Sequence, residues 1–382
     1  MVAGQDTVNA TGRRFDPFMA ALLVLVAALH AALTLLVPDM GQKFQLGDRA
    51  WDRAAKIDQL LGAGDLDAIL AALFYNGPPG DYIFFVPAYA LFGVPGVIIQ
   101  NTALLLVGLW FLYRLGETYF SPRVARLASL VYAVLPATLF HAQTLASEAI
   151  CNPLLIVATW FAARMISQAT PDKRDVILFG LVSAILCSTR QIYLLFPVMV
   201  AGLLLLKAAR GMKSIDPIAV ALALSFSLVA AWSAANLIND GRYPVAPSFH
   251  GLESNLFLRA ERMEAMGGFS LQPAVTKARS LSPAAFLDVV TEQPARFAKT
   301  VISDAINLAG NTGVSMVYGR YFGVFDLKEK GDAGMYAWRD IRDRDGIFAM
   351  LAFMGRTAPL ALVMNVVFVA LWGAMLLVGV YG

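Results

Sequence analysis

The chain has 382 residues, of which 58% are hydrophobic and 15% are charged. Soluble globular proteins carry about 25% charged residues, so this composition excludes an ordinary soluble domain and indicates an integral membrane protein. The net charge of +3 is too small for a nucleic-acid-binding protein, and the basic residues do not form one continuous stripe.

The first apolar run covers residues 17 to 37, which is about the length that a helix needs to cross a bilayer. It is longer than the core of a signal peptide, so the sequence predicts a retained first helix. Further apolar runs lie at 96 to 113, 124 to 140, 149 to 166, 175 to 189, 192 to 206, 217 to 238 and 357 to 379. We therefore expect an all-α polytopic membrane protein with about eight transmembrane helices.

The basic residues between these runs predict the topology, because Lys and Arg are retained on the cytoplasmic side. They occupy alternate connections: Arg13 and Arg14; Arg114, Arg123 and Arg126; Arg164, Lys173 and Arg174; Lys207, Arg210 and Lys213. Both ends are then cytoplasmic. We therefore expect three parts. The first is a transmembrane module at 1 to 240, and it includes a first extracytoplasmic loop at 38 to 95. The second is a large extracytoplasmic loop at 241 to 355, and the third is a C-terminal transmembrane helix at 356 to 382.

Both extracytoplasmic loops carry amphipathic patterns that predict interfacial helices, with an apolar face toward lipid and charges in water. In the first loop, apolar residues recur near helical spacing from Trp51 to Leu73, and the run from Tyr82 to Phe92 is too short to span. We interpret that run as re-entrant or interfacial. In the second loop, residues 251 to 300 are expected to form a further interfacial helix that covers the site or packs against the first loop.

Three charged residues stand out at the ends of apolar segments. Asp48 follows the first apolar run, Glu148 opens the run at 149 to 166, and Arg190 interrupts two runs at the same membrane face. Ionisable groups at such depths face protein or a water-filled cavity and mark a site. The simpler interpretations stay open: Glu148 favours the positive end of a helix dipole, and Arg190 snorkels from a helix end.

Histidine provides no metal signature. For each of the three histidines, His30, His141 and His250, we expect a structural hydrogen bond, and no pair has metal-ligand spacing such as HExxH. His141 lies close enough to Glu148 in sequence to share its cavity. A divalent metal ion is therefore neither required nor excluded, and no other cofactor is expected.

The order of several short motifs resembles the GT-C class of integral membrane glycosyltransferases, the class that contains dolichyl-phosphate-mannose protein mannosyltransferases and the aminoarabinose transferase that modifies lipid A. The similar segments are Gly47-Asp48 with Trp51 and Ala55; Pro78-Pro79-Gly80-Asp81-Tyr82 through Leu91-Phe92-Gly93; Ser147-Glu148; Ser188-Thr189-Arg190; and Trp232-Ser233-Ala234-Ala235-Asn236 followed by Gly241-Arg242-Tyr243-Pro244-Val245 and Gly251. Protein O-mannosylation is not implied, because Arg49 stands where many of those enzymes have a second acidic residue.

The resemblance implies that a sugar is taken from a polyprenyl-phosphate carrier outside the cytoplasm. Because the leaving group is a phosphate, the remaining task is to deprotonate an acceptor hydroxyl, and Asp48 is the candidate base. Glu148 matches the second acidic position of the family. Three roles stay open for it: to orient the acceptor, to hold a basic partner, or to help bind a metal. A cation must neutralise the phosphate. The candidates for binding the lipid phosphate or substrate are Arg190 first, then Arg259, Arg242, Tyr82 and Asn236.

The sequence therefore predicts an inverting glycosyltransferase that moves a sugar from a polyprenyl-phosphate donor to a glycolipid, polysaccharide or protein of the cell envelope. The expected location is a bacterial inner membrane, with the active site facing the periplasm and membrane lipid as a further partner. Two alternatives stay open: a transporter or flippase for lipid-linked saccharides, and a non-catalytic membrane subunit of a glycan-assembly complex. Acidic residues and long loops on one face favour the enzyme.

Overall fold

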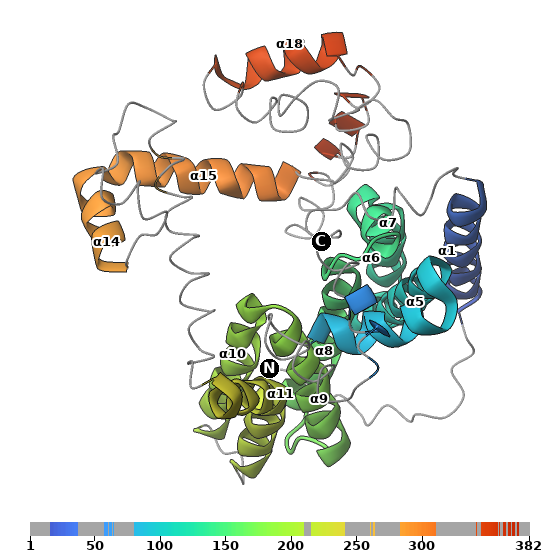
Figure 1. The fold of residues 1–382 in the computed structure, drawn as a ribbon, viewed down its shortest axis with the longest axis vertical. Coiled ribbons are helices and arrows are strands. Elements are labelled where there is room, and N and C mark those ends of the chain that lie inside the picture. The colour runs from blue at the N-terminus through green and yellow to red at the C-terminus, as the bar shows by residue number, and fades with distance from the viewer. Residues whose placement is uncertain are drawn as a thin grey trace.

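The computed structural model describes residues 16–36, 80–209, 215–240, 283–310 and 345–357, with short pieces at 57–59, 61–62, 64, 260, 263, 341, 359, 362–363, 366–367, 369–370 and 373. Within these ranges the chain is helical and has no strand (Figure 1). The predicted all-α fold class is confirmed for this part of the chain.

The helices follow one another as α1 (Pro17–Leu36), α5 (Gly80–Tyr119), α6 (Pro122–Val134), α7 (Pro136–Ala142), α8 (Glu148–Ser167), α9 (Lys173–Thr189), the 3₁₀ turn η1 (Gln191–Leu194), α10 (Leu195–Ala208), α11 (Asp216–Asp240), α14 (Pro283–Glu292), α15 (Pro294–Gly310) and α18 (Ile347–Thr357).

Four helices, α1, α5, α8 and α11, are long and apolar enough to cross a membrane. The chain is therefore an integral membrane protein, but the expected eight spans are not confirmed. Helix α9 has 17 residues, at the lower limit of about 17–25 for a span, and α10 has 14, which is below that limit. Most of the predicted final span at 357 to 379 and most of the second loop lie outside the described residues.

The predicted continuous span at 124 to 140 is wrong, because the run is broken into α6 and α7. The break falls at Leu135, whose ψ of 123° is extended, directly before Pro136. A proline ring clashes with a helical conformation of the preceding residue and removes one backbone donor, so the helix ends there. Helix α6 begins with Ser121, whose hydroxyl accepts a hydrogen bond from the Val124 amide at 3.2 Å.

Helix α5 is interrupted by a kink at Gly93, which separates the Tyr82–Phe92 segment from the membrane span that follows. Gly93 has φ 62° and ψ −148°, a conformation that residues with a Cβ rarely adopt. Beyond the kink, Gly96 packs directly against the backbone carbonyl of Ala88. The Tyr82–Phe92 segment is therefore a helix of its own, distinct from the span that follows. Its placement at the membrane surface stays a prediction.

The helices pack into a bundle in which α5 contacts α6 and α8, α8 contacts α9, and α9 contacts α11. One buried cluster joins α5, α8, α9 and α10 around Phe85, Ile150, Phe179 and Leu204. A second cluster joins α1, α5 and α6 around Leu109. Figure 1 shows α5 to α8 crossing beside α1, with α9 to α11 gathered at the other side.

Polar contacts fix the end of α8 that carries the basic residues. Arg164 Nε lies 2.8 Å from Asp175 Oδ2 of α9. Lys207 Nζ of α10 donates to the backbone carbonyls of Ile166, at 2.8 Å, and Gln168. A cation at a helix C-terminus satisfies carbonyls that lack an intrahelical partner. Helices α8, α9 and α10 are thereby held together at the end that carries these basic residues.

Two helices, α14 and α15, form within the segment 251 to 300 and just beyond it, as the amphipathic pattern predicted. They meet at Pro294, and the rings of Phe286 and Phe297 contact edge to face with centroids 5.9 Å apart. The expected helical structure is therefore present here. Whether this pair covers the site stays a prediction.

Gly108 of α5 allows close packing against α8. We therefore expect a substitution at Gly108 to affect stability differently from one at Gly202, which lies in open space. A Cβ at Gly108 would lie 2.9 Å from Pro153 Cα, whereas a Cβ at Gly202 of α10 has nothing within 4 Å. We expect Gly108→Ala to destabilise the protein by about 1–3 kcal/mol through overpacking. Gly202→Ala should be neutral or stabilising, because alanine favours the helix. Thermal unfolding in detergent measures both, and equal shifts would contradict the close α5–α8 contact.

Candidate functional site

The structure brings Glu148 and Arg190 together as an ion pair. Glu148 is the first residue of α8, and Arg190 follows the last residue of α9. Arg190 Nη2 lies 2.8 Å from Glu148 Oε1, and the two side chains are 45% and 28% exposed. The pair forms because α8 and α9 pack against each other, with the beginning of one beside the end of the other.

Each partner also suits its own helix end. The N-terminus of a helix favours a carboxylate such as Glu148, and the C-terminus favours a cation such as Arg190. A solvent-accessible ion pair contributes only about 0–1 kcal/mol to folding. A guanidinium has five N–H donors in a planar fork. Glu148 engages one edge of that fork, so Arg190 has the capacity to bind a second oxyanion while it stays paired.

The connection that leads into Glu148 is held by side chains of α1 and α5. Asn101 Nδ2 donates to the carbonyl of Thr144 at 2.9 Å. Gln143 Nε2 lies 3.0 Å from His30 Nδ1, so the structural hydrogen bond predicted for His30 is present. Gln143 and Thr144 are fully buried. Two helices distant in sequence therefore fix the backbone from which Glu148 projects.

His141 lies close to the ion pair, in the last turn of α7 and outside the four candidate spans. Burial lowers the pKa of its imidazole below the ordinary value, the Glu148 carboxylate opposes this shift, and the Arg190 charge adds to it. A histidine with a lowered pKa is neutral at pH 7, so His141 contributes hydrogen-bonding capacity and no charge. Its predicted proximity to Glu148 is confirmed.

The first turn of α5 abuts the end of α9 next to Arg190. A Cβ at Gly80 would lie 2.6 Å from the Thr189 backbone nitrogen, a separation that only glycine allows. Asp81 and Tyr82 follow at once, and Asp81 is only 5% exposed. Sequence reasoning quoted Asp81 within a motif without giving it a role. Its burial beside α9 makes it a further acidic residue at this end of the bundle.

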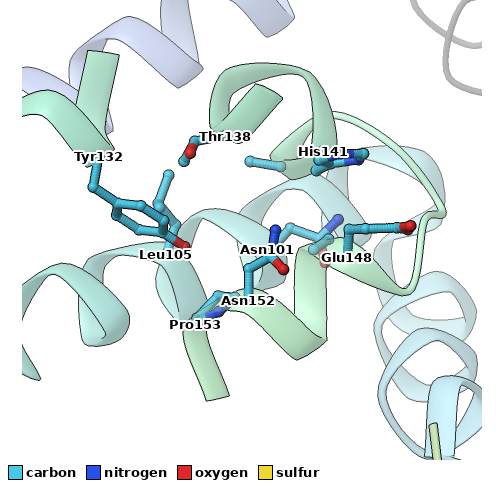
Figure 2. Close-up of a pocket in the computed structure, with 10 residues that line it drawn as sticks. Asn101, Leu105, Tyr132, Thr138, His141, Glu148, Asn152 and Pro153 are labelled. Carbon is cyan, nitrogen blue, oxygen red and sulfur yellow. The ribbon is translucent and has the colours of Figure 1, made fainter. Parts of the chain in front are cut away.

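A pocket opens beside Glu148, between α5, α6, α7 and α8 (Figure 2). It is a small depression rather than an enclosed cavity, and its empty space of about 210 Å³ includes open solvent. Its polar lining residues are Asn101, Tyr132, Thr138, His141, Glu148 and Asn152. Its apolar lining residues are Leu105, Ala142, Ala149 and Pro153. Sequence reasoning missed the two asparagines. They could have been found from the sequence, because an amide side chain within an apolar run is costly to bury and therefore marks a polar contact.

The description does not reach several of the predicted site residues. Asp48, Arg242 and Arg259 are outside the described residues, so their proximity to the ion pair stays a prediction. Asn236 belongs to the last part of α11, and its side chain is also outside the description. In the described part of the chain, no group of three His, Cys, Asp or Glu side chains has the arrangement of a metal site.

Comparison with known proteins matches residues 77–234 to the family model of dolichyl-phosphate-mannose-protein mannosyltransferases. This match confirms the predicted resemblance over these residues. No curated protein and no solved structure matches the chain. The matched region contains Tyr82, Glu148 and Arg190, and it begins after Asp48. It supports a membrane glycosyltransferase of the GT-C type.

Proposed function

We propose, from the match of residues 77–234 to the dolichyl-phosphate-mannose-protein mannosyltransferase family, that the chain transfers a sugar from a polyprenyl-phosphate donor to a cell-envelope acceptor. The observation that carries this proposal is the ion pair of Glu148 with Arg190 at 2.8 Å, which provides a half-exposed guanidinium at one end of the bundle. A lipid-linked donor fits such a position, because its tail stays in the bilayer while its phosphate reaches water.

The charge distribution supports an extracytoplasmic site. Arg164 lies near the end of α8 and Lys173 begins α9, so both basic residues lie at the opposite helix ends from Glu148 and Arg190. Basic residues are retained on the cytoplasmic side. In this proposal the ion pair faces the periplasm of a bacterial inner membrane, where nucleotide sugars are absent and polyprenyl-phosphate sugars serve as donors.

The proposed reaction is a single displacement at the anomeric carbon. The acceptor hydroxyl oxygen forms a bond to that carbon as the bond from the carbon to the phosphate oxygen breaks. The acceptor proton goes to the Asp48 carboxylate, and the bonding electron pair leaves with polyprenyl phosphate. One displacement inverts the anomeric configuration. The phosphate is a weak base, so this step needs no general acid at the leaving group.

The cation that receives the developing phosphate charge is Arg190 in this proposal. Electrostatic stabilisation of a leaving group is usually a large term in catalysis. Glu148 orients that guanidinium, and Tyr82, which packs against the main buried cluster at the start of α5, is a candidate for binding the substrate. Arg242, Arg259 and Asn236 are the further candidates for phosphate or substrate contacts. The acceptor is a glycolipid, a polysaccharide or a protein.

The test is transfer of label by the purified full-length protein. It is supplied with a panel of labelled polyprenyl-phosphate monosaccharides and with an extract of envelope glycolipids and polysaccharides. Transfer from one donor, with opposite anomeric configuration in product and donor, is the expected result. Binding of the carrier without transfer would overturn the proposal in favour of a transporter or a non-catalytic subunit.

A further inference from the structure

The pocket beside Glu148 contains a buried acceptor that no described residue satisfies. Asn101 is fully buried, and its Nδ2 donates to the Thr144 carbonyl at 2.9 Å. That bond fixes which atom of the amide faces the pocket. Asn101 Oδ1 is buried and accepts no hydrogen bond from the residues that the structure describes. An unmatched buried acceptor is costly, so this atom calls for a hydrogen-bond donor from outside the described residues, such as a hydroxyl group.

The other side chains around Asn101 Oδ1 favour a neutral polyol over an anion. Glu148 adds a second acceptor at the edge of the pocket, while Thr138 and Asn152 each offer both a donor and an acceptor. Asn152 lies one turn after Glu148, so both residues are on one face of α8. Two acceptor groups would repel a phosphate. Hydroxyl groups, which donate and accept at once, match this set.

The opposite wall of the pocket is apolar. Leu105 of α5 and Pro153 of α8 line it, and Figure 2 shows both below the polar groups of Thr138 and His141. Ligand sites combine an apolar lining with a few placed polar groups. A sugar ring presents hydroxyl groups at its rim and C–H groups on its face. The pocket is small and open to solvent, so only the hydroxyl-bearing rim of a sugar ring, and not a whole ring, fits into it.

We propose that this pocket binds hydroxyl groups of the sugar carried by the lipid-linked donor, with Asn101, Asn152 and Thr138 as the residues that recognise them. The inference rests on the proposed function. It assigns the phosphate to Arg190 and the sugar to the neighbouring pocket, because Glu148 takes part in both the ion pair and the pocket lining. Recognition of the sugar is then separate from recognition of the phosphate.

The test measures how much the sugar adds to binding. Dissociation constants are determined for the panel of polyprenyl-phosphate monosaccharides and for bare polyprenyl phosphate, with the full chain in detergent. The variants are Thr138→Val and Asn152→Leu, which remove polar groups at similar volume and leave the Asn101–Thr144 bond intact. Thr159→Val is the matched control, because the Thr159 hydroxyl bonds to Leu155 within α8 and does not line the pocket.

We expect the wild type to bind its sugar-bearing donor more tightly than bare polyprenyl phosphate. Each pocket variant should reduce that preference by roughly 2- to 10-fold, the value of one hydrogen bond, without changing the affinity for bare polyprenyl phosphate. Thr159→Val should keep the preference. Thermal unfolding of each variant excludes misfolding as the cause of a loss.

Three results would overturn the inference, each in a different way. If the wild type binds no polyprenyl phosphate at all, the proposed function fails with it. If the wild type prefers the sugar-bearing donor and both pocket variants keep that preference, the function stands and the pocket holds only water. If the variants keep that preference but raise the KM for the acceptor in the transfer assay described above, the pocket binds the acceptor's hydroxyl groups instead.

Discussion

Asp48→Asn should reduce sugar transfer by roughly 10²- to 10⁴-fold, the usual contribution of a general base. An asparagine has nearly the shape of the carboxylate and cannot accept the acceptor's proton. The variant should therefore fold normally and bind the polyprenyl-phosphate donor with unchanged affinity. The measurements are single-turnover transfer with saturating donor, donor binding, and thermal unfolding.

Asp58→Asn is the matched control for this experiment. Asp58 lies in the same loop between the first two long apolar segments, and its side chain is exposed. The control should transfer sugar at close to the wild-type rate. Normal turnover by Asp48→Asn would remove Asp48 as the base and direct attention to Asp81, the buried acidic residue at the start of α5.

Arg190→Gln should reduce transfer by roughly 10²- to 10³-fold, because it removes a charge that stabilises the leaving phosphate. Glutamine keeps a donor but has no positive charge. Arg114→Gln is the matched control: Arg114 Nη1 lies 2.8 Å from Glu117 Oε2, and these two side chains are 34% and 17% exposed. The control removes a similar surface ion pair and should leave transfer nearly unchanged.

A double-mutant cycle with Glu148→Gln tests what the ion pair does. If Glu148 acts by orienting Arg190, the double variant should transfer no more slowly than Arg190→Gln alone, because the two residues share one interaction. The transfer rates of the wild type, both single variants and the double variant provide the coupling. Additive losses would contradict the orienting role and assign Glu148 an independent contact with the acceptor.

Sequence alone located the two ends of the ion pair but not the pair itself. Glu148 and Arg190 were identified because ionisable groups at the ends of apolar runs are costly and therefore informative. Their contact at 2.8 Å depends on how α8 packs against α9, which no local pattern encodes. The same holds for Asn101 and His30, whose partners Thr144 and Gln143 lie on the connection before α8.

What the sequence by itself determined is the class of protein and one segment that is too short to span. Composition indicated a helical membrane protein, because a bilayer requires long apolar helices, and the short length of the Tyr82–Phe92 run excluded it as a span. Hydropathy did not anticipate the break at Leu135, although Pro136 was its visible cause. Only the tertiary structure decided the ion pair and the pocket beside Glu148, because both are made by side chains from separate helices whose contact is set by packing.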